Sequence, residues 1–145
     1  MKILALDVGD RRIGMAISDE LGISGQPLPP LTNDKNQWKE LINIIGLHQI
    51  QYIVIGMPYR LDGQQGPQAE KVRAWADELR QHIHLPIEMV DERMTTRTAE
   101  RVLIEGNVRR QKRKQLVDSL AALLILQTYL DRKRKDDRDD GVSRG

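Results

Sequence analysis

One short apolar run constrains the fold of this chain more than any other feature, and it reads QYIVIGMP at residues 51–58. It is unbroken, with Gly56 and Pro58 at its end. A strand that is apolar on both faces needs cover on both faces, which is typical of a central strand in a parallel sheet. We therefore expect a layered α/β domain with helices on both faces of the sheet.

The residues before this run indicate three antiparallel strands. Residues 3–8 and 13–18 are apolar and flank the turn GDRR. The following stretch, GQPLPPLT at residues 25–32, is rich in Pro. Because Pro cannot donate a ladder hydrogen bond, this stretch permits at most an irregular or edge strand.

Two amphipathic helices are predicted on either side of residues 51–58. The first follows the capping candidates Asn33 and Asp34 and has Gly46 near its end. The second has Pro67 at an early position. Their apolar stripes are Trp38, Leu41, Ile42 and Ile45 in the first helix, and Val72, Trp75, Ala76, Leu79 and Ile83 in the second.

The remainder of the chain predicts a strand at residues 86–93, a third helix at residues 95–107 and a last helix at residues 114–131. The order is therefore βββαβαβα. Strands that alternate with helices require right-handed parallel crossovers. We expect a mixed five-stranded sheet in a single domain over residues 1–132, followed by a charged tail at 133–145 that is disordered because it lacks apolar residues apart from Val142.

Composition excludes several classes of protein. The chain of 145 residues has no Cys, which rules out disulfides and Cys-based zinc sites. It has no apolar run near the roughly 20 residues that a membrane span needs, and no signal-peptide pattern. We expect a cytoplasmic protein without a membrane partner.

Four acidic residues stand where an α/β fold alone does not require them. Asp7 ends the first strand, Asp91 and Glu92 end the strand at residues 86–93, and Asp118 lies in the last helix. The carboxyl ends of parallel strands form the usual site crevice of open α/β sheets. Carboxylates that converge there repel one another, and a hard divalent cation such as Mg²⁺ or Mn²⁺ is the simplest compensation. Helical spacing places Asp118 on the same stripe as Ala121, Ala122, Ile125 and Tyr129.

Each acid also has an ordinary structural explanation. In that explanation Asp7 serves only to open a turn, and Asp91 and Glu92 are an ordinary polar strand end. Asp118 would then be the N-cap of a helix that begins at Ser119. The three His residues fall near element ends without a shared ligand spacing, so we interpret them as surface or loop residues: His48, His82 and His84.

The positive charge of the chain is concentrated in one segment. The net charge is only +2, but RRQKRK at residues 109–114 has five cations in six positions. A plain solvated loop needs no such density, which favours contact with a polyanion. Aromatic residues make up 3% of the chain, which favours recognition of backbone and shape over base stacking. The predicted phosphate-binding cations are Arg109, Arg110, Lys112, Arg113 and Lys114.

Four blocks carry a resemblance to a known family: LALDVGDRRIGMAISD, VIGMPYRLDGQQG, VDERMTT and KQLVDSLAALLILQTYLD. Together, and in this order, they resemble the YqgF/RuvX family, whose members are named as pre-16S rRNA nucleases and are similar to RuvC-type Holliday junction resolvases. The resemblance implies an RNase H-like fold and metal-dependent hydrolysis of phosphodiester bonds. The acids that align are Asp7, the pair Asp91 and Glu92, and Asp118.

The chain departs from the resolvases at one acid. They carry their second acid at the end of the fourth strand, where this chain has Gly, Met and Pro at residues 56–58. In this chain the corresponding acid comes at the end of the next strand, which puts cleavage of Holliday junctions in question. Asp91 and Glu92 are the alternative ligands there. We favour Glu92 for its longer reach.

The resemblance also implies roles for the site residues. One or two ions of Mg²⁺ or Mn²⁺ are expected on Asp7, Glu92 and Asp118, with Asp7 bridging. Arg93, Thr95 and the loop at residues 61–66 are expected to position the scissile phosphate. The expected substrate is structured RNA, most specifically the 5′ end of precursor 16S rRNA in ribosome biogenesis. Branched DNA is the alternative, and the chain is expected to act as a monomer or homodimer.

Two other functions compete with this one. The motif DVGDRRIG is similar to the first phosphate motif of sugar kinases and actin-like ATPases, but these need two such domains and a second motif. A non-catalytic nucleic-acid-binding or assembly factor is the second alternative. A clustered negative site gives no advantage to a protein that only binds polyanions, so the acids argue against it.

Overall fold

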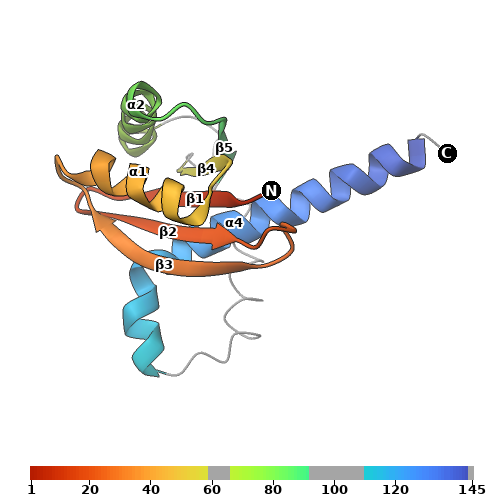
Figure 1. Cartoon of the computed structure of the whole chain (residues 1–145), viewed down its shortest axis with the longest axis horizontal. Coiled ribbons are helices and arrows are strands. Elements are labelled where there is room, and N and C mark those ends of the chain that lie inside the picture. The colour runs from red at the N-terminus through yellow and green to blue at the C-terminus, as the bar shows by residue number, and fades with distance from the viewer. Residues whose placement is uncertain (59–65, 92–109, 144–145) are drawn as a thin grey trace.

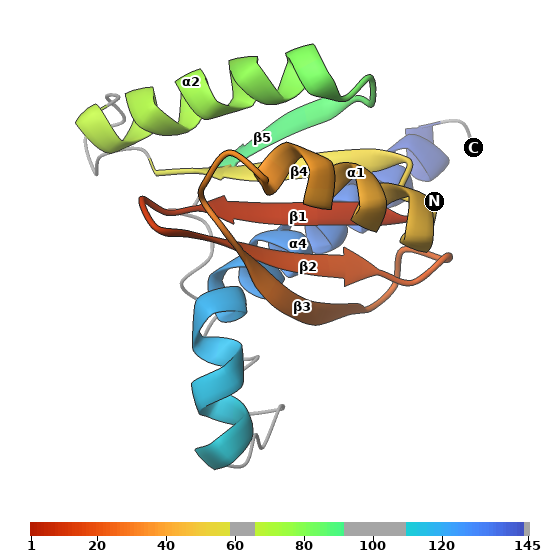
Figure 2. The same ribbon diagram turned by 60° about the vertical axis from the view of Figure 1, so that its left-hand side comes forward.

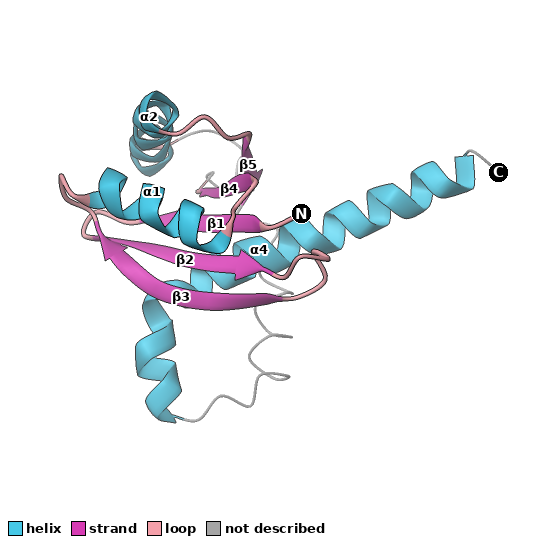
Figure 3. Cartoon of the chain, in the orientation of Figure 1, coloured by secondary structure: helices cyan, strands magenta, loops and turns pink. Residues whose placement is uncertain are grey.

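The computed structural model describes residues 1–58, 66–91 and 110–143, and within the last range it describes the side chains of residues 119–135. In chain order the elements are β1 (Ile3–Val8), β2 (Arg12–Ser18), β3 (Gly25–Thr32), α1 (Gln37–His48), β4 (Tyr52–Met57), α2 (Pro67–His82), β5 (Ile87–Asp91) and α4 (Arg110–Ser143) (Figure 3). The helix predicted at residues 95–107 lies outside the described residues. The other predicted elements are confirmed.

The strands form one mixed sheet in the order β3-β2-β1-β4-β5. β2 pairs antiparallel with both β1 and β3, whereas β4 pairs parallel with both β1 and β5. The predicted mixed five-stranded sheet is therefore confirmed. Its central strand β4 has Ile53, Val54 and Ile55 fully buried, as the unbroken apolar run requires.

Strand β3 confirms the expectation of an irregular edge strand. It carries Pro27, Pro29 and Pro30, and its register with β2 shifts between Ile13 and Met15. In the described part of the sheet β3 pairs only with β2, so its outer side can accommodate residues that lack an N–H.

Helices α1 and α2 cover one face of the sheet and α4 covers the other (Figures 1 and 2). Alternate residues of β1 serve the two layers, because successive side chains of a strand point to opposite faces. Leu4 and Leu6 pack toward α1 and α2, whereas Ile3 and Ala5 pack toward α4. The predicted arrangement of helices on both faces is confirmed.

The buried stripe of α1 differs from its prediction. Ile42 is 49% exposed, whereas Gln37 is buried beside Trp38 and Leu41. Gln37 takes this place because its side-chain oxygen accepts a hydrogen bond from the indole N–H of Trp75 at 2.9 Å. The Trp38 ring packs 5.2 Å from that of Trp75 and anchors α1 against α2.

The predicted caps of α1 are also wrong. The N-cap position is Asn36, and it makes no side-chain capping hydrogen bond. The Asp34 carboxylate accepts from the Asn36 N–H at 2.9 Å, one step ahead of the helix. Asn33 bonds to a different part of the fold, close to Asp7.

Helix α4 continues well past its predicted end, and Figure 1 shows it extending beyond the sheet. Its helical backbone includes residues 133–143, which disagrees with the disorder that we expected there. Opposite charges at helical spacing support such a polar helix, as in the 3.2 Å ion pair between Arg134 and Asp131. Despite its 34 residues α4 is too polar to cross a membrane, and no other described helix is long and apolar enough to do so.

Candidate active site

Asp7 is the next-to-last residue of β1 and is half-buried. Since Ile3 and Ala5 pack toward α4, strand alternation places Asp7 on the α4 face. Its partner on β2 is Gly14, and the register that pairs Leu6 with Ile55 brings Gly56 of β4 beside it on the other side. These two neighbours have no side chains, so neither adjacent strand places a side chain next to Asp7 on the α4 face.

The turn that follows Asp7 is held by two residues. The Gly9 N–H donates to the Arg12 carbonyl at 2.9 Å, and a Cβ at Gly9 would lie only 2.8 Å from that oxygen. Asn33 donates its side-chain N–H to the Gly9 carbonyl and its backbone N–H to the Arg11 carbonyl, both at 2.9 Å. Asn33 was predicted as a cap because no local pattern reveals a partner 24 residues away.

Asp91 ends β5 and pairs with Met57 of β4. Val90 packs toward α4, whereas Met57 and Met89 pack toward α1 and α2. By strand alternation Asp91 lies on the face opposite to Asp7. The structure therefore brings both acids to the carboxyl-terminal edge of the sheet, as predicted, but on different faces.

Asp118 lies inside α4, and the N-cap alternative is wrong because the helix already includes Arg110. Its side chain is outside the described part of the structure. The stripe predicted to share its face is largely confirmed, because Ala122, Ile125 and Tyr129 are buried against the sheet.

The remaining predicted site residues are described only in part. Glu92, Arg93, Thr95 and Arg109 lie outside the described residues, as do residues 61–65 of the predicted phosphate loop. Arg110, Lys112 and Arg113 have helical backbone at the start of α4, ahead of the helix start that we predicted at residue 114, and Lys114 has the predicted helical backbone. Within the described ranges, no group of three His, Cys, Asp or Glu side chains is placed to hold a metal ion.

The His residues lie as predicted, at element ends. His48 ends α1, His82 ends α2 and His84 is exposed between α2 and β5. His82 has a packing role that the sequence pattern missed, because its ring stacks on Trp38 at 4.8 Å. We assign none of the three to the site.

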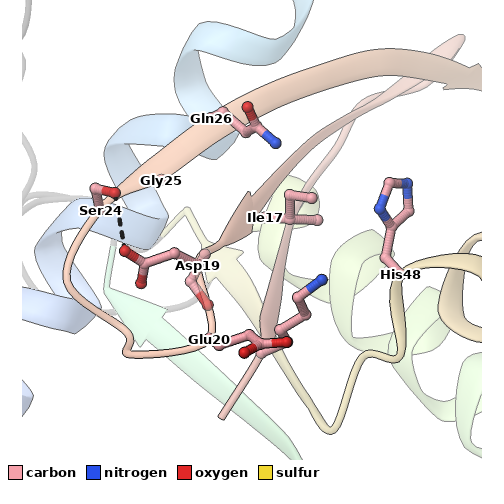
Figure 4. Close-up of a pocket in the computed structure, with 9 residues that line it drawn as sticks. Ile17, Asp19, Glu20, Ser24, Gly25, Gln26 and His48 are labelled. Carbon is pink, nitrogen blue, oxygen red and sulfur yellow. Dashed lines mark hydrogen bonds between the residues drawn. The ribbon is translucent and has the colours of Figure 1, made fainter.

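A pocket of about 440 Å³ lies at the other end of β1, among Lys2, Asp19, Gln26 and His48 (Figure 4). Asp19 has a structural role there. It accepts hydrogen bonds from the Ile23 N–H at 2.8 Å and the Ser24 hydroxyl at 3.1 Å, and the bond from Ile23 is the main reason that the pKa of the Asp19 carboxyl lies below its usual value. The pocket contains no predicted site residue, so we place the candidate active site at the Asp7 end of the sheet.

Comparison with known sequences gives a consistent result. A family model described as RuvX, Holliday junction resolvase, matches residues 1–132. A relative from Carboxydothermus hydrogenoformans is 45% identical over 138 residues, which cover 94% of this chain and 100% of the relative. A relative from Clostridium tetani is 47% identical over 133 residues, which cover 90% of this chain and 96% of the relative. Both carry the name "Putative pre-16S rRNA nuclease".

Two solved structures have a similar fold. Thermus thermophilus RuvC, in complex with a Holliday junction substrate, has a TM-score of 0.58 at 14% identity and covers 91% of this chain and 96% of its own. The fowlpox virus Holliday junction resolvase has a TM-score of 0.56 at 14% identity and covers 91% and 99%. At this identity the likeness concerns the fold alone, and it confirms the predicted RNase H-like architecture.

Proposed function

Because this chain belongs to the RuvX family, we propose that it is a divalent-metal-dependent nuclease that hydrolyses phosphodiester bonds in structured nucleic acid. We propose the 5′ end of precursor 16S rRNA as its substrate, processed in the cytoplasm during ribosome biogenesis. The observation that carries this proposal is the match, over nearly the whole of both chains, to relatives that are 45% and 47% identical and named for that activity.

We assign metal binding to Asp7, Glu92 and Asp118. Asp7 and the buried stripe that continues from Asp118 both belong to the layer between the sheet and α4. The alternation of β5 favours Glu92, two positions after Val90, over Asp91, which belongs to the opposite face. This reason is independent of the longer reach of Glu.

The chemistry of this donor set fits a hard divalent cation. Carboxylate oxygens are the ligands that Mg²⁺ and Mn²⁺ prefer, and the strand neighbours of Asp7 on both sides are glycines. When bound, such an ion supplies a hydroxide nucleophile and neutralises charge that develops on the phosphate.

The protein contributes fixed positions for the reacting groups. Asp7 lies on a strand that is hydrogen-bonded to neighbours on both sides, so its backbone is set in place before a substrate arrives. Arg93 and Thr95, close in sequence to Glu92, and residues 61–66 are proposed to donate hydrogen bonds to the non-bridging oxygens of the scissile phosphate.

The cations of α4 are proposed to hold phosphates farther along the substrate. Helical spacing puts Lys114 one turn and Arg110 two turns before Asp118 on one side of the helix. Cations at such regular spacing are expected where a polynucleotide backbone binds. Lys112, Arg113 and Arg109 widen the basic segment.

Branched DNA is the second candidate substrate, because the family description and the similar structures name Holliday junctions. One observation favours RNA. Strand β4 ends at Met57 in a stretch without an acid, where the resolvases carry their second acid. The proposed second acid, Glu92, comes one strand later, so the proposed metal site differs from that of the resolvases.

The test is a cleavage assay with two labelled substrates, a transcript that spans the 5′ end of 16S rRNA and a four-way DNA junction. We expect the full-length protein to cut the transcript in Mn²⁺ but not in EDTA, and to leave the junction intact. Preferential cutting of the junction would replace RNA by DNA as the substrate. Binding of both without cleavage in Mn²⁺ would contradict a nuclease.

A further inference from the structure

Arg12 lies on the same face of the sheet as Asp7. Along β2, Ile13 and Met15 pack toward α1 and α2, whereas Ala16 packs toward α4. Strand alternation therefore places Gly14 and Arg12 on the α4 face. Arg12 is exposed at the beginning of β2, so substrate can reach it from solvent.

The register of the sheet makes Arg12 a diagonal neighbour of Asp7. Asp7 pairs with Gly14, and Arg12 lies two residues from Gly14 on the same strand. Diagonal neighbours in an antiparallel pair are about 7–8 Å apart, within the reach of a long side chain. Gly14 places no side chain between them.

The backbone of Arg12 is held in place. Its carbonyl accepts the Gly9 N–H at 2.9 Å, and it pairs with Thr32 of β3. Asn33 fixes the same turn through its bonds to Gly9 and Arg11. This ordered backbone fixes the position on the sheet from which the Arg12 side chain extends.

We propose that the Arg12 guanidinium binds the non-bridging oxygens of the scissile phosphodiester beside Asp7, an inference that rests on the proposed nuclease function. A guanidinium presents paired N–H donors that match two phosphate oxygens. Next to clustered carboxylates, it provides the positive charge that a polyanionic substrate needs at that point.

Arg11 is the matched control. It has the same charge, is exposed in the same turn and precedes β2 by one residue. If Arg12 only adds to the positive charge of the turn, substitution of either residue has the same effect. If Arg12 contacts the reacting phosphate, only its loss slows the chemical step.

The experiment compares the parent with Arg12→Gln, Arg12→Lys, Arg11→Gln and Asp7→Asn by single-turnover cleavage of the 16S precursor transcript in Mn²⁺. Binding to the same transcript in EDTA and thermal melting are measured in parallel. We expect Arg12→Gln to lower the rate about a hundredfold, as loss of one preorganised donor does, and Arg12→Lys to recover part of that loss. We expect Arg11→Gln to stay within about twofold of the parent, because it leaves this donor in place.

Equal rate losses in Arg11→Gln and Arg12→Gln, or a parental rate in Arg12→Gln, would overturn the role of Arg12. Unchanged melting excludes misfolding, and a rate loss that exceeds the loss of binding assigns the effect to the chemical step. The proposed function fails separately. The proposed nuclease function is contradicted if the parent does not cleave or if Asp7→Asn cleaves like the parent. An inactive Asp7→Asn variant together with a fully active Arg12→Gln variant rejects only the role of Arg12.

Discussion

The position of Asp118 within its helix decides between the two roles that were predicted for this residue. As the N-cap of a helix that begins at Ser119, it would have a local structural role. Inside α4 it has no capping function, and an acid on a stripe with buried Ala122 and Ile125 calls for a compensating charge. We propose a bound metal ion as that charge.

Asp118→Asn tests that assignment through stability. Without metal, removal of one charge from a mutually repelling group should leave the protein as stable as the parent or more stable by about 1 kcal/mol, which is about 2–4 °C in melting temperature. Mn²⁺ should raise the melting temperature of the parent more than that of the variant, because only native-state binding stabilises. Cleavage should be lost.

Melting curves with and without Mn²⁺, run beside the cleavage assay, make this measurement. Asp77→Asn is the control, since this acid lies on α2 in an exposed 3.0 Å ion pair with Arg80. A variant Asp118→Asn that responds to Mn²⁺ like the parent and cleaves normally would remove Asp118 from the site.

At the scale of elements, the sequence patterns succeeded where one physical rule dominates. The apolar run at residues 51–58 demands burial on both faces, and β4 has it. The sequence patterns failed where a partner far away in the sequence determines the position of a side chain. Gln37 is buried where its side chain accepts a hydrogen bond from Trp75. Asn33 bonds to the turn after β1 instead of capping α1. Local patterns contain neither partner.

The sequence predicted the edge of the sheet at which the candidate site lies but not the face. Strand ends predicted the edge of the sheet that holds Asp7 and Asp91, but the choice of face depends on the register with β4 and on the positions of the helices. The role proposed for Arg12 depends on the register of β1 with β2, which pairs Asp7 with Gly14 two residues from Arg12 and which the letters GDRR alone do not reveal.

The docking of α4 depends on Ser119, which is fully buried and donates its hydroxyl to the Leu28 carbonyl of β3 at 2.6 Å. Ser119→Ala should lower the free energy of unfolding by about 1 kcal/mol, because the part-buried carbonyl of Leu28 loses this hydrogen-bond donor. Urea unfolding measures the change.

Thr128→Val is the matched control for Ser119→Ala. The Thr128 hydroxyl bonds to the Leu124 carbonyl within the same helix at 2.8 Å, so its loss breaks no contact between helix and sheet. We expect a clearly smaller loss of stability than for Ser119→Ala. Equal losses would show that the bond to Leu28 does not hold α4 on the sheet.

The basic start of α4 makes a separate prediction about binding. Replacement of Arg110 and Arg113 together by Ala should weaken binding to all nucleic-acid sequences alike and flatten the log–log salt dependence by up to about two units. The control replaces Arg73 and Arg80, two exposed cations of α2, in the same way. A slope that the α4 variant leaves unchanged would identify the segment as a solvated surface.

At the scale of the whole molecule, the proposed site is assembled from segments far apart in the chain. Asp7 comes from β1, Glu92 follows β5 and Asp118 comes from α4, which covers the face of the sheet on which Asp7 lies. The proposed site therefore needs the folded sheet and α4 together. The proposed metal site and the proposed hydrolysis both require the negative charge of Asp7.

Asp7→Asn is therefore the most direct test. Asn keeps the size and much of the hydrogen bonding of Asp but removes the charge that a metal needs. Asp10→Asn is the control, because Asp10 lies three residues later, is exposed and approaches Lys71 at 3.5 Å. In Mn²⁺, with the 16S precursor transcript, we expect Asp7→Asn to bind like the parent and to cleave slower by orders of magnitude, while Asp10→Asn cleaves normally. Cleavage by Asp7→Asn at the parental rate would contradict the account.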